Sequence, residues 1–269
     1  MKLSSYGYIF NARKFSFPLE ETVTNFCAFF DEVVCVTVES EDDTRQRLRT
    51  LESQYPNFKV IDSNIQILGN NRFDGQLKTL ALNYCTNKIK VICDYDEKFP
   101  LHQKSLWIDY ATQLSSMTRV DVDGIFLPVI DLYKNEECIR ADQNIGIKFR
   151  MHNENIVKRG VIKSAELTGG FFDTSKSDST EPLRADGSLG KFISPIVDMN
   201  SLNPLKAANL NFIPHVFHYG YLDLARRTKI GREFWKQAWE ERSGKTENVA
   251  TEVAEISSFP AIYHNLKLP

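Results

Sequence analysis

Three carboxylates follow an apolar run in the middle of the chain. Residues 88–93 read KIKVIC, and Asp94, Asp96 and Glu97 come directly after them. A continuous apolar run is typical of a strand buried in a parallel sheet, and open α/β sheets bind ligands just beyond the carboxyl ends of such strands. Because side chains alternate along extended backbone, we expect Asp94 and Asp96 to point the same way and Tyr95 the other. Such a DxD pair suits Mg2+ or Mn2+ carrying the phosphates of a substrate.

An isolated pair of acids is more often a solvated strand end, so the interpretation depends on the elements around it. The first half of the chain alternates strand and helix patterns. Strands are predicted at 6–11, 32–39, 59–61 and 88–94. Helices are predicted from Pro18, from Asp42 or Asp43 to about residue 54, over 73–84, and from Pro100 to about residue 115. This alternation predicts an α/β fold, with a mostly parallel sheet and helices on both faces.

After about residue 120 the alternation ends. Residues 123–132 read DGIFLPVIDL and predict a strand that Pro128 places at a sheet edge or at a bulge. The segment 173–190 is rich in Ser, Asp, Gly and Thr, which is typical of a loop over an active site or of disorder. An aromatic strand is predicted at 211–221, and a basic amphipathic helix over about 222–242.

Composition limits the class of protein. The 269 residues are 42% hydrophobic and 25% charged, as in ordinary soluble globular proteins. The net charge of −2 gives no overall electrostatic footprint for nucleic acid. Five scattered cysteines form no CxxC pair, which favours a reducing compartment without disulfides. With no apolar window of about 18 residues and no signal-peptide pattern, we expect a cytoplasmic protein without a transmembrane segment.

Four motifs occur in a defined order along the chain. Asn11-Ala12-Arg13 follows the first strand, VTVESEDDT stands at 36–44, FDGQLKTLAL at 73–82 leads into the acidic strand, and HYGY stands at 218–221. In this order the motifs resemble the GT-A glycosyltransferases, specifically bacterial family-2-like enzymes that use nucleotide sugars. The resemblance implies a GT-A-like, Rossmann-like domain over 1–225. Its nucleotide-sugar-binding half would be 1–133 and its acceptor-side half 134–225, followed by a C-terminal helical extension at 226–269.

The resemblance also implies which residues form the site. Those expected to bind the nucleotide sugar are Asn11, Arg13, Thr37, Glu39, Lys78, Asp94 and Asp96. Asp96 would contact the metal directly, while Asp94 would lie nearer the ribose or reach the metal through water. On a strand, His218 faces away from its aromatic neighbours, so it could complete the metal site or contact the pyrophosphate. Lys78 is equally consistent with a solvated helix position.

The catalytic base is not evident from the motifs. An inverting transfer needs a carboxylate that accepts the proton of the acceptor hydroxyl. Lys163 and Ser164 stand where the resembled subgroup has a His-Glu pair. Glu166 and Asp173, on either side of a glycine pair, are therefore the candidate catalytic residues, with Asp121 a further one. A retaining mechanism stays open.

The predicted function is transfer of a sugar from a nucleotide-diphosphate donor, a UDP-sugar first of all, to a hydroxyl acceptor with the help of Mg2+ or Mn2+. The acceptor would be a saccharide or a lipid-linked saccharide in surface polysaccharide or lipopolysaccharide assembly, with peripheral membrane contact left open. One alternative is a nucleotidyltransferase, although residues 11–20 contain no glycine-rich loop. The other is a non-catalytic relative that binds a glycan or a partner protein. Glycosylation of a modified DNA base is a further variant, which the near-neutral charge disfavours.

Overall fold

A computed structural model describes residues 1–67, 70, 73–117, 122–133, 138–140, 146–160, 181–194, 213–221 and 263–265. The first half of these forms a parallel sheet of four strands in the order β3-β2-β1-β4. Their bounds are β1 Leu3–Ile9, β2 Glu32–Thr37, β3 Phe58–Asp62 and β4 Ile89–Ile92. The helices are α1 Leu19–Phe29, α2 Thr44–Gln54, α3 Phe73–Asn83 and α4 Lys104–Met117, the last preceded by the short helix η1 Leu101–Gln103. The predicted strand–helix alternation is confirmed, with ends that shift by a few residues.

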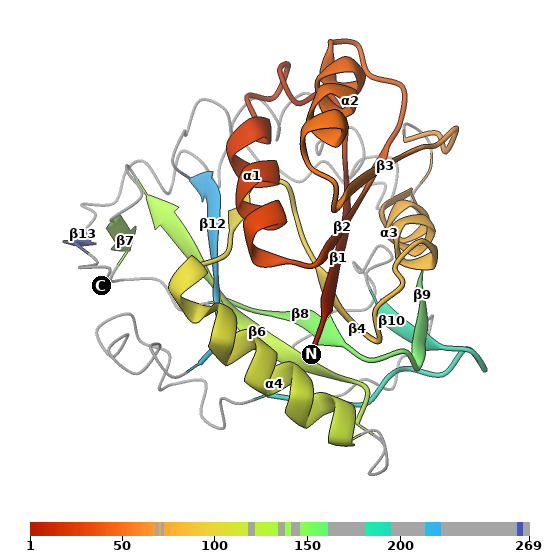
Figure 1. Ribbon diagram of the computed structural model, residues 1–269, viewed down its shortest axis with the longest axis vertical. Coiled ribbons are helices and arrows are strands. Elements are labelled where there is room, and N and C mark those ends of the chain that lie inside the picture. Colours follow the sequence, from red (N-terminus) through yellow and green to blue (C-terminus); the bar gives the residue numbers. More distant parts are fainter. Residues whose placement is uncertain are drawn as a thin grey trace, which may run out of the picture.

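Helices cover both faces of this sheet (Figure 1). One core layer joins α1, α2 and α4 to the sheet through buried residues such as Phe26, Leu48 and Trp107. The other core layer packs α3 against β1 and β2 through Phe73 and Leu77. The α/β fold with helices on both faces is therefore confirmed.

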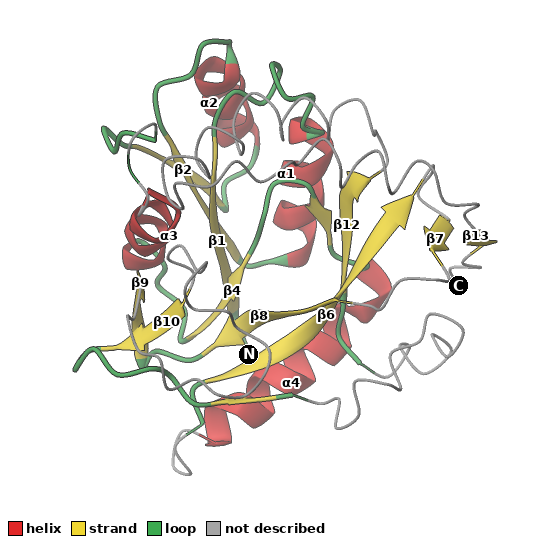
Figure 2. Ribbon diagram, turned by 180° about the vertical axis from the view of Figure 1, so that it is seen from behind, coloured by secondary structure: helices red, strands yellow, loops and turns green. Residues whose placement is uncertain are grey.

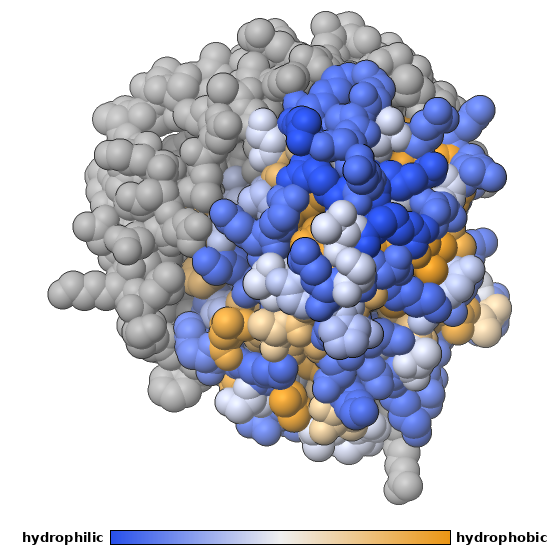
Figure 3. Space-filling model, turned by 45° about the horizontal axis from the view of Figure 1, so that its top comes forward, coloured by the Kyte–Doolittle hydropathy of each residue, from blue (hydrophilic) through white to orange (hydrophobic). Residues whose placement is uncertain are grey.

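The end of the molecule that carries α2 shows a mostly hydrophilic surface (Figure 3).

The second half of the chain extends the sheet with strands of both directions. β8 pairs with β4 and β6 in antiparallel register, so β6 runs parallel to β4. The strands of this half are β5 Glu97–Lys98, β6 Gly124–Tyr133, β7 Cys138–Arg140, β8 Gly146–His152, β9 Ile156–Gly160, β10 Glu181–Arg184, β11 Phe192–Ile193, β12 Val216–Tyr221 and β13 Tyr263–Asn265. The hairpin of β9 and β10 lies beside α3 (Figure 2). Two elements far apart in sequence, α3 and β9, therefore face each other.

Pro128 was expected to mark an edge strand or a bulge, and the edge strand is wrong. β6 pairs with β8 on one side and with β11 and β12 on the other, and its register with β8 shifts between Ile125 and Phe126. β11 pairs at Gly124 and Ile125, and β12 pairs from Val129 onward. Pro128 itself lies opposite Ile147 of β8, and neither β11 nor β12 pairs at its position.

Several predictions fall outside the described residues. These include the helix over 222–242, the part of the loop before residue 181, and most of the segment 226–269, within which the structure describes only β13. The proposed division into a domain at 1–225 and an extension stays a prediction. Among the described helices, none has the length and apolar character to cross a membrane.

Candidate functional site

The acids predicted from the sequence lie at the carboxyl end of β4, beside β1. The Cys93 amide donates a hydrogen bond to the Tyr6 carbonyl at 2.9 Å, which extends the contact between the two strands past the end of β4. Gly7 makes this approach possible, since a Cβ built on it would lie 2.2 Å from the Cys93 carbonyl oxygen. The chain then turns through Tyr95, whose buried ring packs against Phe26. The acidic segment is therefore a turn anchored to β1.

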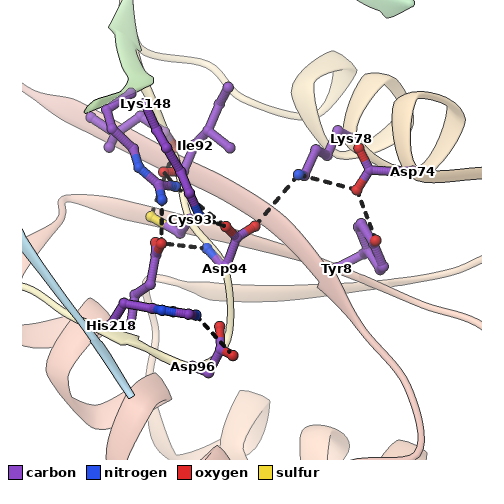
Figure 4. Close-up of polar contacts among 12 residues, drawn as sticks. Tyr8, Asp74, Lys78, Ile92, Cys93, Asp94, Asp96, Lys148 and His218 are labelled. Atoms are coloured by element: carbon purple, nitrogen blue, oxygen red, sulfur yellow. Dashed lines mark hydrogen bonds and ion pairs between the residues drawn. The ribbon is translucent and has the colours of Figure 1, made fainter. Parts of the chain in front are cut away.

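Asp94 is surrounded by positive charge (Figure 4). Its carboxylate oxygens lie 3.4 Å from Lys78 Nζ, 3.5 Å from Arg150 Nη1 and 3.8 Å from Lys148 Nζ. Burial alone would raise the pKa of Asp94, but these cations hold it well below its usual value. The Asp94 side chain is 32% exposed, so this group of charges is partly open to a ligand. Asp94 stays ionised there, with three cations around it that can also meet phosphate oxygens.

Lys78 reaches Asp94 from α3 and is held in place by a second acid. Its Nζ lies 3.1 Å from Asp74 Oδ1, which also accepts a hydrogen bond of 2.8 Å from the Tyr8 hydroxyl. Burial alone would lower the pKa of Lys78, but the carboxylates of Asp74 and Asp94 raise it. The side chain is buried and charged, in contrast to the alternative of a solvated helix lysine.

Asp96 has a different partner from Asp94. Its Oδ2 lies 3.3 Å from His218 Nε2 (Figure 4), and its carbonyl accepts a hydrogen bond of 2.7 Å from the Tyr219 amide. β12 brings these residues together because it pairs with β5, where His218 lies opposite Glu97. A turn at Tyr95 and Asp96 breaks the extended backbone on which the expected common direction of the two aspartates depended, and the two side chains have different partners.

The Asp96 and His218 pair fits a divalent ion that also binds substrate. Adjacent ligands of an octahedral ion with bonds of about 2.1 Å are about 3.0 Å apart, close to the separation observed here. Among the described residues, no group of three or more His, Cys, Asp or Glu side chains could hold a metal ion. Mg2+ usually binds one or two carboxylates together with waters and substrate phosphates. The chemistry of this pair therefore suits an ion that completes its coordination with a ligand.

Glu97 and Arg150 form a buried ion pair beneath the acidic turn. The Arg150 guanidinium contacts the Glu97 carboxylate and donates a hydrogen bond of 3.2 Å to the Ile92 carbonyl. Glu97 also accepts a hydrogen bond of 3.1 Å from the Asp94 amide. Burial raises the pKa of Glu97 to about 7, although the charge of Arg150 opposes this. Because Glu97 is fully buried, it supports the shape of the turn and does not meet a ligand.

The loops after β1 and β2 are joined by side-chain hydrogen bonds. Asn11 has a φ of 49° and is mostly buried, and its Oδ1 accepts a hydrogen bond of 2.7 Å from the Glu41 amide. Arg13 is exposed and pairs with Asp43 at 2.6 Å. At the end of β2, Thr37 is buried and Glu39 is exposed. These residues, which we predicted to contact the nucleotide, lie at or just beyond the carboxyl ends of β1 and β2. Their roles stay predictions.

The structure also contains site residues that the motifs did not identify. Lys148 and Arg150 come from β8, and the sequence interpretation gave neither of them a role. In β8, Lys148 and Arg150 alternate with apolar residues. This alternation was the available signal that the two cations share one face of a strand. The candidate catalytic residues Glu166 and Asp173 lie outside the described residues, as do Asp121, Lys163 and Ser164.

Comparisons with known proteins give similarity to solved structures alone. No family model matches the sequence, and no curated protein matches it. The mannosyltransferase PcManGT from Pyrobaculum calidifontis, solved with GDP-Man and Mn2+, is 14% identical over 96% of this chain and 69% of that one, with a TM-score of 0.46. S. aureus TarS is 16% identical over 57% of this chain, which spans 28% of the TarS chain, with a TM-score of 0.36. The 4-diphosphocytidyl-2C-methyl-D-erythritolsynthase from Anaerococcus prevotii is 13% identical over 56% of this chain and 70% of that one, with a TM-score of 0.32.

Proposed function

We propose that this chain is a glycosyltransferase that moves a sugar from a nucleoside diphosphate donor, a UDP-sugar first of all, to a hydroxyl of a saccharide or lipid-linked saccharide. One observation carries the proposal. At the carboxyl end of the central strand β4, Asp94 meets Lys78, Lys148 and Arg150, while Asp96 meets His218. This is the position where open α/β sheets bind ligands. A diphosphate needs the combination present here, cations for its oxygens and acids for an accompanying metal ion.

Asp96 and His218 would hold Mg2+ or Mn2+. When bound, such an ion stabilises the negative charge that develops on the departing diphosphate and fixes its position. Lys78 and Lys148 would contact the diphosphate oxygens from the side of the site opposite His218. Asp94, held ionised by the same cations, would then be available to a ribose hydroxyl or to a metal-bound water.

The transfer itself is a substitution at the anomeric carbon. The acceptor oxygen forms a bond to that carbon while the bond from the carbon to the diphosphate oxygen breaks, and the bonding electrons leave with the nucleoside diphosphate. The proton of the acceptor hydroxyl passes to a carboxylate, for which Glu166 and Asp173 are the proposed groups. The site residues act by orienting the donor and by balancing the charge of the leaving group.

Thermal denaturation with a panel of nucleotide sugars, each with and without Mn2+, tests this proposal. Ligands that bind the folded state raise the melting temperature, so we expect the largest rise with one donor and Mn2+ together. We expect Asp96→Asn to lose the part of the rise that depends on Mn2+. A rise with nucleoside triphosphates and none with nucleotide sugars would favour a nucleotidyltransferase. A rise with a free glycan and with no nucleotide would favour a non-catalytic binding protein.

A further inference from the structure

Arg159, on β9, is a buried cation that the donor site does not use. Arg159 is 4% exposed, and its Nε and Nη1 atoms have no hydrogen-bond partner. No acidic side chain in the described part of the chain lies within ion-pair distance of its guanidinium. Buried N–H donors of a charged group that have no hydrogen-bond partner are costly. The position is therefore unusual for a residue that serves folding alone.

The backbone of Arg159 is held by Thr79 of α3. Its amide donates a hydrogen bond of 2.9 Å to the Thr79 hydroxyl, whose hydrogen is shared between the Gly75 carbonyl at 2.6 Å and the Arg159 carbonyl at 3.0 Å. The guanidinium carbon lies 4.9 Å from the centre of the Phe149 ring. A guanidinium over an aromatic face keeps the N–H groups at its edge available, and that edge matches the oxygens of a carboxylate or phosphate.

The described residues around Arg159 only partly balance its charge. Two neighbouring residues, His152 and Tyr6, form a neutral pair with a hydrogen bond of 2.8 Å, in which burial lowers the pKa of His152 to about 3. Asp74, whose charge also acts on Arg159, is already engaged by Lys78 through its Oδ1, while its buried Oδ2 has no hydrogen-bond partner. Burial lowers the pKa of Arg159, and the negative charge of Asp74 only partly opposes this. The region thus has free hydrogen-bond donors on Arg159 and a free acceptor on Asp74.

We propose that Arg159 forms a subsite for an additional anionic group of the substrate, a carboxylate or a phosphate, distinct from the diphosphate that meets Asp94 and its cations. This proposal rests on the proposed glycosyl transfer and specifies its substrate class as an acidic sugar or a phosphorylated acceptor. The anion would accept hydrogen bonds from Nε and Nη1. A hydroxyl next to it would donate to Asp74 Oδ2, as expected for a sugar acid that bears both groups.

The test compares two donors that differ in one group. Melting temperatures are measured against concentration for UDP-glucose and UDP-glucuronate, each with Mn2+, and for inorganic phosphate alone. Charge-assisted hydrogen bonds predict an apparent Kd at least about tenfold lower for the acidic donor, or stabilisation by phosphate if the anion belongs to the acceptor. We expect Arg159→Met to abolish either preference and to melt, without ligand, no lower than the wild type. Lys158→Met, at the exposed neighbouring position of β9, should keep the preference for the anionic ligand.

The outcomes separate the subsite from the donor site. If UDP-glucose and UDP-glucuronate stabilise the wild type equally and phosphate has no effect, the subsite is refuted and the proposed function stands. If no nucleotide sugar binds but phosphate stabilises the wild type and not Arg159→Met, the proposed function fails and the subsite stands. Arg159→Lys, which keeps the charge without the planar fork, should retain a weaker preference and serves as the second variant if Arg159→Met does not fold. A variant with a lowered melting temperature and unchanged anion effects would assign Arg159 a purely structural role.

Discussion

Arg150→Met should destabilise the protein strongly, and more at high pH than at low pH. Arg150 is 1% exposed at its side chain and contacts Glu97, the Ile92 carbonyl and Asp94. Removing one partner of a buried ion pair costs about 3–5 kcal/mol, because the remaining charge is left buried. Glu97 would be that remaining charge, and it can avoid the cost only by binding a proton.

The pH dependence follows from the pKa of Glu97. Burial raises it from 4.5 in the reference state to about 7, which corresponds to about 3 kcal/mol. A carboxyl with a raised pKa in the folded state contributes stability below the unfolded value, and that contribution is lost as the pH rises from about 4.5 to about 7. The charge of Arg150 lowers the pKa of Glu97, so removing Arg150 raises that pKa further. Each further pKa unit then lowers the free energy of unfolding at high pH by about 1.4 kcal/mol. The difference between Arg150→Met and wild type should therefore be larger at pH 8 than at pH 5.

Urea denaturation at pH 5, 6, 7 and 8 measures this difference. The double variant Arg150→Met with Glu97→Gln should recover part of the loss at pH 8, because no charge is then left buried. Lys148→Met serves as the control, since Lys148 is 49% exposed and lies 3.8 Å from Asp94; a surface pair of this kind contributes at most about 1 kcal/mol. Equal destabilisation by Arg150→Met at pH 5 and pH 8, with no recovery in the double variant, would refute this reasoning.

Three further predictions concern the ligand site. Lys78→Met should weaken binding of a nucleotide sugar by about tenfold or more, measured by titration calorimetry, because it removes a charged contact to the diphosphate; unchanged binding would exclude this contact. Gly7→Ala should lower the free energy of unfolding by about 1–3 kcal/mol, since its Cβ would lie 2.2 Å from the Cys93 carbonyl oxygen, and a urea melt equal to wild type would contradict it. Asp96→Asn and His218→Ala should each abolish the Mn2+-dependent rise in melting temperature while the melt without metal stays within a few degrees; a rise that survives both changes would place the metal elsewhere.

The first half of the fold could be predicted from local patterns. The helix at Leu19–Phe29 and the strand at Glu32–Thr37 show their periodicity within a few residues of sequence. Local pattern was insufficient for Pro128, because its place inside the sheet depends on where two short strands from later in the chain begin and end. A rule about one residue cannot include that information.

The site shows the same division between local and distant information. Lys78 and His218 were expected near the acids, and the structure brings Lys78 to 3.4 Å from Asp94 and His218 to 3.3 Å from Asp96. The partners from β8 were missed because each contact spans more than 50 positions, as in the pairing of Arg150 with Glu97. Antiparallel strands that enter a parallel sheet leave no fixed spacing in the sequence, so only the fold shows which cations meet which acids.

The acidic turn is fixed from two sides before any ligand arrives. On one side, the Cys93 amide is bound to Tyr6 in β1. On the other, β12 pairs with β5 and the Tyr219 amide binds the Asp96 carbonyl at 2.7 Å. These are backbone contacts, so the sheet itself brings Asp96 and His218 together. A site held in this way needs little rearrangement on binding, and Asp96→Asn can therefore remove a metal ligand while the turn keeps its shape.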